Sequence, residues 1–334
     1  MKAQIAAIEY ALPDHCLTNE ELDRLHPEWS IHQVAKRTGV LSRFISGEDE
    51  TALDLAVTAC ERLFERGEAA RQDIGAVIFC TQSPDYIMPA NAPLLQHRLG
   101  LSTSIPAFDY NLACSGFIYG LFLGKVMIES DQADNILLVT SETYSKYINP
   151  GDRSTMALFG DGAAVTLLRK GHKGLSEFVF GTDGSGGDRF IVPAGGAKIP
   201  RSEKTSAVSV DASGNIRTPE NIYMDGPGVL SFFKKQIPIS VQELFKKTGY
   251  SASDISLYVF HQASALALDY LEKSLRIPQR KMYRNLSRIG NTVSASIPIA
   301  IRDAQIEGLV TPESRLLLVG FGVGYSWGAC VLDW

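Results

Sequence analysis

The 334-residue sequence predicts an α/β protein built from two duplicated halves. Its main support is an internal repeat, because the pattern of residues 73–80 (DIGAVIFC) returns in residues 254–261 (DISLYVFH), 181 positions later. Each copy is an acidic turn followed by an apolar run that is typical of a buried strand. At nearly the same spacing, residues 135–140 correspond to residues 314–319, and two pairs at one offset indicate duplication.

Helical segments are expected between these strands, at residues 51–66, 116–130, 228–247 and 264–275. Apolar strands that alternate with helices indicate mixed sheets covered by helices. We therefore place an N-terminal half at residues 1–175 and a C-terminal half at residues 176–334. Residues 194–220 are polar and contain Gly and Pro, which predicts an excursion over the surface.

Composition narrows the functional class. The chain is 45% hydrophobic and 21% charged, as in globular proteins, and its net charge of −5 argues against general nucleic-acid binding. We find no apolar run long enough to span a membrane and no signal peptide, so we expect a cytoplasmic protein. The five cysteines are scattered and form no C-x-x-C pair, so we expect no metal site.

Cys114 is the strongest candidate for a catalytic side chain. It lies in the segment NLACSGF, where small residues give way to an apolar helical run, so its sulfur is expected at a helix N-terminus. That position favours a thiolate. Taken alone, a cysteine beside apolar residues is more often a buried structural thiol. The small neighbours favour a nucleophile here, because they let a substrate approach the backbone.

His261 and Asn291 complete the chain order Cys, His, Asn that thiol catalysis can use. His261 follows a predicted strand, where α/β proteins place their chemistry, although a histidine bonded to a nearby carbonyl is the simpler alternative. Asn291 lies between a glycine and a threonine, which is also typical of a turn or a helix cap. The repeat places Asn291 and Cys114 at equivalent strand-to-helix corners of the two halves.

Several motifs carry a resemblance to a known family. The segments ACSGF, HQAS, GNTVSAS and GFGVGYSWG, together with RTGV at residues 37–40 and DRST at residues 152–155, resemble the β-ketoacyl-acyl-carrier-protein synthase III family. The resemblance spans essentially the whole chain. It implies the thiolase fold, with two duplicated halves in a layered α-β-α-β-α arrangement, and a homodimer.

The resemblance also implies a reaction, a condensation that starts fatty-acid biosynthesis or a related pathway. Cys114 would be acylated by an acyl-CoA primer, and His261 with Asn291 would then bind the thioester carbonyl of malonyl carrier protein during decarboxylation. The backbone N–H groups of Cys114 and Val323 would form a second oxyanion hole. No cofactor is required, and acyl-CoA and acyl carrier protein are the expected partners.

Substrate contacts follow from the same resemblance. Arg37 and Arg153 would hold the nucleotide of CoA, with Gln33 where a tryptophan is expected. Met88 from the partner subunit and Phe321 would form the primer pocket. Carrier-protein docking is assigned, from local charge rather than from the resemblance, to the basic side chains of Lys234, Lys235, Lys273 and Arg276.

The chain also departs from the family pattern. Val323 is bulkier than the usual Gly or Ala, Ser264 replaces an asparagine, and Leu266 replaces a docking arginine. Gln33 weakens adenine stacking, and Met88 in place of Phe admits a longer primer. The basic run 273–288 contains no acidic residue, and a solvated surface is its simpler explanation.

Other functions remain open at this point. A thiolase would need a second catalytic cysteine, and Cys330 lies in an alternating, core-like strand. A transferase to an amine or alcohol would not need Asn291. Condensing enzymes that use aroyl or long-chain acyl thioesters share the three residues. A non-catalytic thioester-binding homologue would be expected to lack the nucleophile, whereas Cys114 is present.

Overall fold

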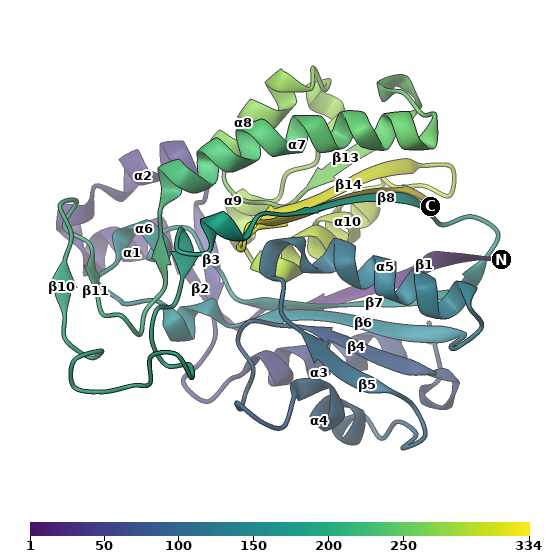
Figure 1. The fold of residues 1–334 in the computed structure, drawn as a ribbon, viewed down its shortest axis with the longest axis horizontal. Coiled ribbons are helices and arrows are strands. Elements are labelled where there is room, and N and C mark those ends of the chain that lie inside the picture. The colour runs from purple at the N-terminus through teal and green to yellow at the C-terminus, as the bar shows by residue number, and fades with distance from the viewer.

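Two β-sheets and three layers of helices alternate in the computed structural model, which describes residues 1–334. Figure 1 shows the order of the layers: α3 and α4 lie below the first sheet, α5 and α10 lie between the sheets, and α7 and α8 cover the second sheet. This α-β-α-β-α order buries both faces of each sheet, as expected for α/β proteins.

The first sheet has the strand order β1-β7-β6-β4-β5. Its strands are β1 (Lys2–Ala11), β7 (Gly162–Gly171), β6 (Asn135–Glu142), β4 (Ala76–Cys80) and β5 (Ala107–Tyr110). Strand β4 runs parallel to β5 and β6, and every residue of its sequence AVIFC is buried. A continuous apolar run is typical of a parallel strand covered on both faces. The outer helices are α3 (Ala52–Glu65) and α4 (Asn91–Arg98).

The second sheet has the order β13-β14-β15-β8. Its strands are β13 (Leu257–Phe260), β14 (Arg315–Gly322), β15 (Ser326–Asp333) and β8 (Leu175–Thr182). Strands β13 and β14 are parallel, as are β4 and β6 in the first sheet. The covering helices are α7 (Gly226–Thr248) and α8 (Ala265–Ser274), and the central helices are α5 (Gly116–Glu129) and α10 (Ser296–Ile306). The four helices predicted from sequence are therefore confirmed, with ends that differ by one or two residues.

The two halves match element by element. The 3-10 turns η3 (Ala113–Ser115) and η8 (Val293–Ala295) precede α5 and α10. Both turns open with a residue of positive φ, Ala113 at 42° and Val293 at 53°, and these residues are 180 positions apart. The counterpart of Cys114 is therefore Ser294, and Asn291 corresponds to Asn111. The prediction that Cys114 and Asn291 lie at equivalent corners is therefore confirmed, although the two residues are offset by three positions within the corner.

Smaller elements surround one edge of the molecule. They are β2 (His15–Thr18) paired with β3 (Ser42–Ile45), α1 (Asn19–Leu25), α2 (Ile31–Thr38), α6 (Arg153–Met156) and α9 (Leu286–Ile289). The predicted surface excursion at residues 194–220 is mostly exposed and contains a short hairpin of β10 (Ser209–Val210) with β11 (Ile216–Arg217). The antiparallel pair β9 (Phe190–Ile191) and β12 (Tyr223–Met224) flanks it on either side. Arg217 joins the outer hairpin to Asp152, the N-cap of α6, at 2.6 Å.

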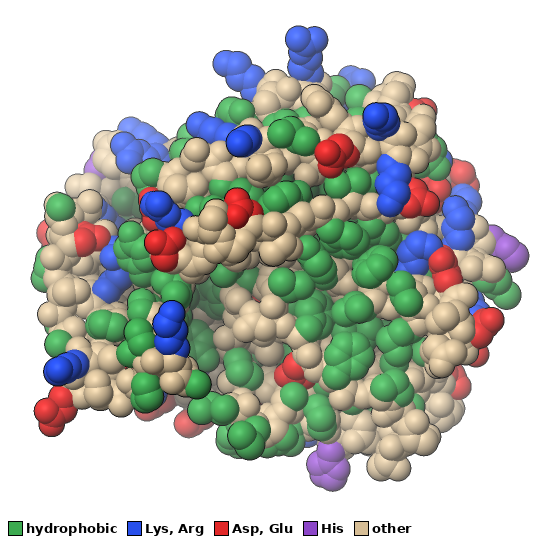
Figure 2. Space-filling view, viewed as in Figure 1, with side chains coloured by type: hydrophobic (Ala, Val, Ile, Leu, Met, Phe, Trp, Pro, Cys, Tyr) green, Lys and Arg blue, Asp and Glu red, His purple; other side chains and the backbone are tan.

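The surface carries two distinct kinds of patch. Figure 2 shows hydrophobic side chains gathered on the face formed by α5 and neighbouring strands, where Phe108, Phe122 and Val126 are between 37% and 50% exposed. Basic side chains lie along the top of the same view, over α7 and α8. None of the helices combines the length and apolar character needed to cross a bilayer. No group of three or more His, Cys, Asp or Glu side chains is arranged to hold a metal ion.

Candidate active site

Cys114 lies where the two halves of the fold meet. It is the central residue of η3, directly before α5, and is only 3% exposed. Strand β14 of the second half passes so close that a Cβ at Gly322 would lie 2.8 Å from the Cβ and 3.1 Å from the Sγ of Cys114. Only glycine permits this approach, because contacts under 3.0 Å are not tolerated between side-chain carbons. The cysteine is therefore held against the backbone of the opposite half.

The position of Cys114 before α5 favours a thiolate, as predicted, but burial of its sulfur acts in the opposite direction. Burial raises the pKa of the Cys114 thiol, and the nearby carboxyl of Glu142 raises that pKa further. Loss of hydration favours the neutral thiol, whereas the field at the start of α5 favours the thiolate. The thiol must therefore give up its proton to another group when it attacks.

His261 follows β13 immediately and is 2% exposed. Its Nδ1 lies 2.7 Å from the Oγ of Ser296, at the start of α10, and its ring meets Phe321 edge-on with centroids 5.5 Å apart. Burial lowers the pKa of His261 to about 3, so the ring is neutral near pH 7. When Ser296 donates to Nδ1, the ring proton resides on Nε2, which makes no hydrogen bond within the chain.

Asn291 is oriented by a hydrogen bond to the backbone. Its Oδ1 accepts from the N–H of Val293 at 2.9 Å, where the positive φ of Val293 turns the chain toward it. The Nδ2 group makes only a long contact of 3.4 Å, to the carbonyl of Ala263. Since the oxygen is already engaged, the amide presents N–H donors to a ligand.

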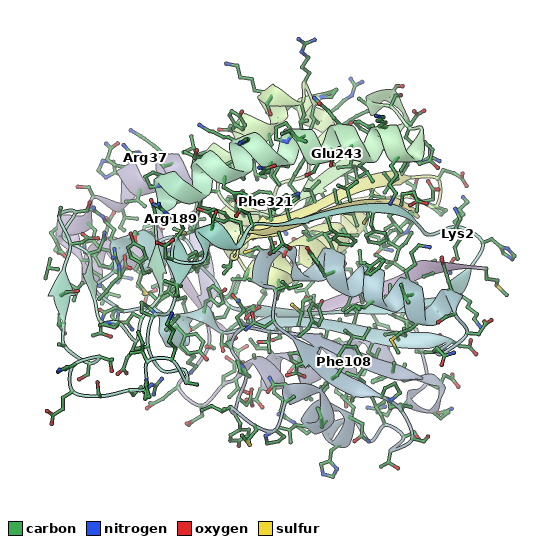
Figure 3. The ribbon with its side chains drawn as sticks, in the orientation of Figure 1. Lys2, Arg37, Phe108, Arg189, Glu243 and Phe321 are labelled. Carbon is green, nitrogen blue, oxygen red and sulfur yellow. The ribbon has the colours of Figure 1, made fainter.

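One cavity brings these predicted residues together. Cys114, His261 and Asn291 all line a space of about 410 Å³, and Phe321 and Arg37 line it as well. Figure 3 shows Arg37 on α2, at one end of the molecule, and Phe321 near its centre on β14. The cavity therefore connects a buried thiol and two polar side chains with a basic residue on the outer helix.

The other predicted contacts lie outside this cavity. Arg153 lines a separate space of about 300 Å³ beside Trp29 and His26, whose rings stack with centroids 3.7 Å apart. Gln33 lines neither space, and its Nε2 lies 3.0 Å from the neighbouring His32. Met88 is 80% exposed on the loop before α4. A contribution from Met88 to this site would require a second subunit.

Further predicted residues lie near the entrance or behind the site. Val323 directly follows Gly322, and its side chain lines another cavity, of about 270 Å³. Lys234 and Lys235 belong to α7, and the ammonium of Lys234 lies 4.9 Å from the ring centroid of Tyr270 on α8. Lys273 lies in the last turn of α8, and Arg276 follows the C-cap of that helix, Leu275. The four basic residues thus share the outermost helical layer, as Figure 2 shows for basic side chains in general.

Sequence reasoning missed a buried carboxyl behind Cys114. Glu142, at the end of β6, is fully buried and accepts hydrogen bonds from the Oγ of Ser294 at 2.8 Å, the N–H of Gln82 at 2.9 Å and the Oγ of Ser83 at 3.1 Å. Burial raises the pKa of Glu142 to about 7. No motif marks Glu142 in the sequence, because its hydrogen-bond partners come from two distant segments of the chain.

Comparisons with known proteins agree with this geometry. The family model described as 3-Oxoacyl-[acyl-carrier-protein (ACP)] synthase III matches residues 108–184, and the model for the C terminal part of the same family matches residues 245–334. A β-ketoacyl-[acyl-carrier-protein] synthase III of Streptomyces coelicolor is 36% identical over 97% of this chain and 94% of its own length. The chain belongs to the 3-oxoacyl-[acyl-carrier-protein] synthase III family.

Solved structures of synthase III proteins show the same fold. One 3-oxoacyl-(acyl-carrier-protein) synthase III has a TM-score of 0.98 and 41% identity, with complete coverage of both chains. The synthase III of Thermus thermophilus has a TM-score of 0.87 and 32% identity, with 99% of each chain covered. A priming β-ketosynthase from the R1128 polyketide pathway has a TM-score of 0.85 at 25% identity. The predicted thiolase fold and the family assignment are confirmed.

Proposed function

We propose that this synthase III condenses an acyl-CoA primer with malonyl-acyl-carrier protein through an acyl-cysteine intermediate. The observation that carries the proposal is the single cavity lined by Cys114, His261 and Asn291. A nucleophile and two orientable hydrogen-bond donors in one buried space suit acyl transfer and stabilisation of an enolate. The product is a 3-oxoacyl-acyl-carrier protein.

In the first half-reaction, the sulfur of Cys114 attacks the thioester carbonyl of the primer. The new carbon–sulfur bond replaces the bond to CoA, which leaves as a thiol and carries away the proton that Cys114 loses. Because the pKa of the Cys114 thiol is raised, we propose that its proton passes to the leaving sulfur of CoA during the exchange, while His261 keeps its proton on Nε2. The backbone N–H groups of Cys114 and Val323 are proposed to bind the developing oxyanion.

In the second half-reaction, malonyl carrier protein loses CO₂. The electrons of the broken carbon–carbon bond form an enolate, whose oxygen is stabilised by the N–H donors of His261 Nε2 and Asn291 Nδ2. The enolate carbon then attacks the acyl-Cys114 carbonyl, and the thiolate of Cys114 is released. The orientations imposed by Ser296 on His261 and by Val293 on Asn291 leave these donors free.

We assign substrate binding to the residues around the entrance. Arg37 lines the catalytic cavity and is proposed to bind phosphates of CoA, and Arg153, which lines the separate space beside Trp29, is proposed to bind the same nucleotide. The basic side chains of α7 and α8 are proposed to dock acyl carrier protein. We propose a homodimer, supported by the loop bearing Ile87 and Met88, which are 93% and 80% exposed and large for a solvated surface. The reaction requires no cofactor, and we place it in the cytoplasm.

The proposal is tested by the mass of the carrier protein. Malonyl carrier protein is incubated with enzyme and with acyl-CoAs from acetyl to dodecanoyl, plus an aroyl-CoA, and 3-oxoacyl carrier protein is followed by mass spectrometry. Wild type should form product with at least one primer, whereas Cys114→Ala should lose nearly all of this activity. Equal product formation by Cys114→Ala would contradict the proposal. The primer that reacts distinguishes fatty-acid initiation from a specialised aroyl or long-chain condensation.

A further inference from the structure

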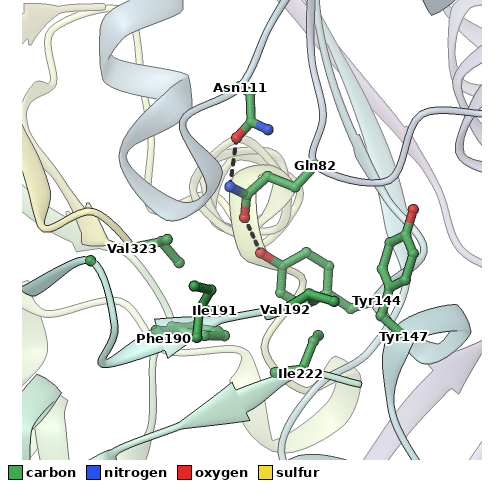
Figure 4. Close-up of a pocket in the computed structure, with 10 residues that line it drawn as sticks. Gln82, Asn111, Tyr144, Tyr147, Phe190, Ile191, Val192, Ile222 and Val323 are labelled. Carbon is green, nitrogen blue, oxygen red and sulfur yellow. Dashed lines mark hydrogen bonds between the residues drawn. The ribbon is translucent and has the colours of Figure 1, made fainter. Parts of the chain in front are cut away.

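A second cavity of about 270 Å³ lies beside the catalytic one (Figure 4). The two share Phe190 in their walls, and Val323 of the second cavity directly follows Gly322, which lines the first. Gly322 is also the residue whose backbone contacts Cys114. We infer that a group attached to the sulfur of Cys114 extends past Gly322 and Phe190 into this second space. A volume of this size corresponds to about nine water-sized groups.

Most of the second cavity is apolar, but one side carries a line of hydrogen-bonding side chains. Tyr144 donates its hydroxyl proton to the Oε1 of Gln82, and the Nε2 of Gln82 donates to the Oδ1 of Asn111 at 2.5 Å (Figure 4). The apolar remainder consists mainly of Phe190, Ile191, Val192 and Ile222.

The topology of the first sheet explains why these three side chains meet. Strand β4 lies between β6 and β5 and runs parallel to both. The carboxyl ends of all three strands therefore lie at one edge of the sheet. Tyr144, Gln82 and Asn111 each follow one of these strands by one or two residues. Ligands of α/β proteins bind at such an edge. The backbone N–H of Gln82 is also fixed by the buried Glu142, so the row has a defined position.

The row of Tyr144, Gln82 and Asn111 has unused N–H donors at its Asn111 end. The Oε1 of Gln82 and the Oδ1 of Asn111 each accept one hydrogen bond within the row. The Nδ2 of Asn111 makes no hydrogen bond within the chain, and the Nε2 of Gln82 has a second N–H to offer. The wall therefore presents fixed N–H donors beside an apolar pocket. Such an arrangement suits an apolar group that bears an acceptor oxygen.

We propose that Gln82, Asn111 and Tyr144 select acyl primers whose chain carries a hydroxyl or carbonyl oxygen beyond the thioester. The inference rests on the proposed function, because it requires the acyl group to be bound to Cys114. The apolar wall contacts the carbon chain, and the amide of Asn111 donates to its oxygen. Tyr144 acts as a positioning residue, since it fixes the orientation of Gln82.

The test compares matched primers. Butyryl, hexanoyl and benzoyl thioesters of CoA are each paired with the thioester that carries a terminal hydroxyl group, and kcat/KM for acylation of Cys114 is measured. We expect wild type to prefer the hydroxylated member of at least one pair by about tenfold, the size of one net hydrogen bond. Asn111→Leu should abolish this preference, and Tyr144→Phe provides a second variant with a smaller structural change. Ile222→Val, which alters the apolar wall alone, should keep the ratio.

Two results would overturn the inference. One is a ratio near one for every pair in wild type, and the other is a preference that persists in both Asn111→Leu and Tyr144→Phe. If plain acyl-CoAs still acylate Cys114 in that case, the proposed function stands and only the selection is wrong. Failure of every thioester to acylate Cys114 would contradict the proposed function and the inference with it.

Discussion

Replacing Gly322 with alanine tests how tightly the two halves hold the nucleophile. The new Cβ would lie 2.8 Å from the Cβ of Cys114, whereas ordinary contacts begin at 3.4 Å, so strand and cysteine must separate by about 0.6 Å. Overpacking of this kind costs about 1–3 kcal/mol of folding free energy. A misplacement of about 1 Å at a reacting atom costs about a hundredfold in rate. We therefore expect Gly322→Ala to lower kcat/KM for condensation by at least about tenfold.

Gly196→Ala provides the matched control, because a Cβ there meets no heavy atom within 4 Å and its φ is not positive. Steady-state condensation and urea unfolding are measured for both variants. The control should match wild type in both measurements. Wild-type kcat/KM in Gly322→Ala would show that Cys114 does not require the close approach of β14, and the reasoning would then be refuted.

Three further predictions address individual polar groups. Asn291→Ala should retain acylation of Cys114 and lose about a hundredfold or more in condensation, the typical cost of one oxyanion donor; equal loss in both half-reactions would contradict its role. Ser296→Ala removes the hydroxyl that fixes the tautomer of His261, so the rate of condensation should fall about tenfold. An unchanged rate and pH–rate profile would argue against a positioning role for Ser296. Because burial raises the pKa of Glu142 to about 7 from 4.5, the folded state holds its proton more tightly than the unfolded state, and the contribution of Glu142 to stability falls as pH rises from 4.5 through 7. Urea unfolding should therefore show Glu142→Gln gaining on wild type, by on the order of 3 kcal/mol, between pH 4.5 and 8, and a constant difference would contradict the assignment.

Much of the fold follows from local patterns in the sequence. The apolar run of β4 and the similar run of β13 are typical of buried parallel strands, and their common spacing reveals the duplication. The exact correspondence of the two corners did not follow, because it depends on the positive φ of Ala113 and Val293. Neither residue type predicts that backbone conformation, which the surrounding packing imposes.

Sequence also singled out three residues that the structure brings into one cavity, Cys114, His261 and Asn291, but it did not indicate their electrostatics. Sequence indicates that Cys114 precedes a helix, yet the pKa of its thiol depends on burial and on Glu142, which is distant in the chain. The closeness of Gly322 to Cys114 likewise arises only when the second half packs on the first. Gln82 and Asn111 carry no recognisable motif, since their relation follows from the order of neighbouring strands.

The most direct test of the central claim is the intact mass of the protein after incubation with acyl-CoAs of increasing length, for wild type and Cys114→Ala. The account predicts a mass gain equal to one acyl group in wild type with at least one primer. It predicts no gain in Cys114→Ala. An equal gain in Cys114→Ala, or no adduct on wild type with any acyl-CoA, would contradict an acyl-Cys114 intermediate formed from CoA thioesters.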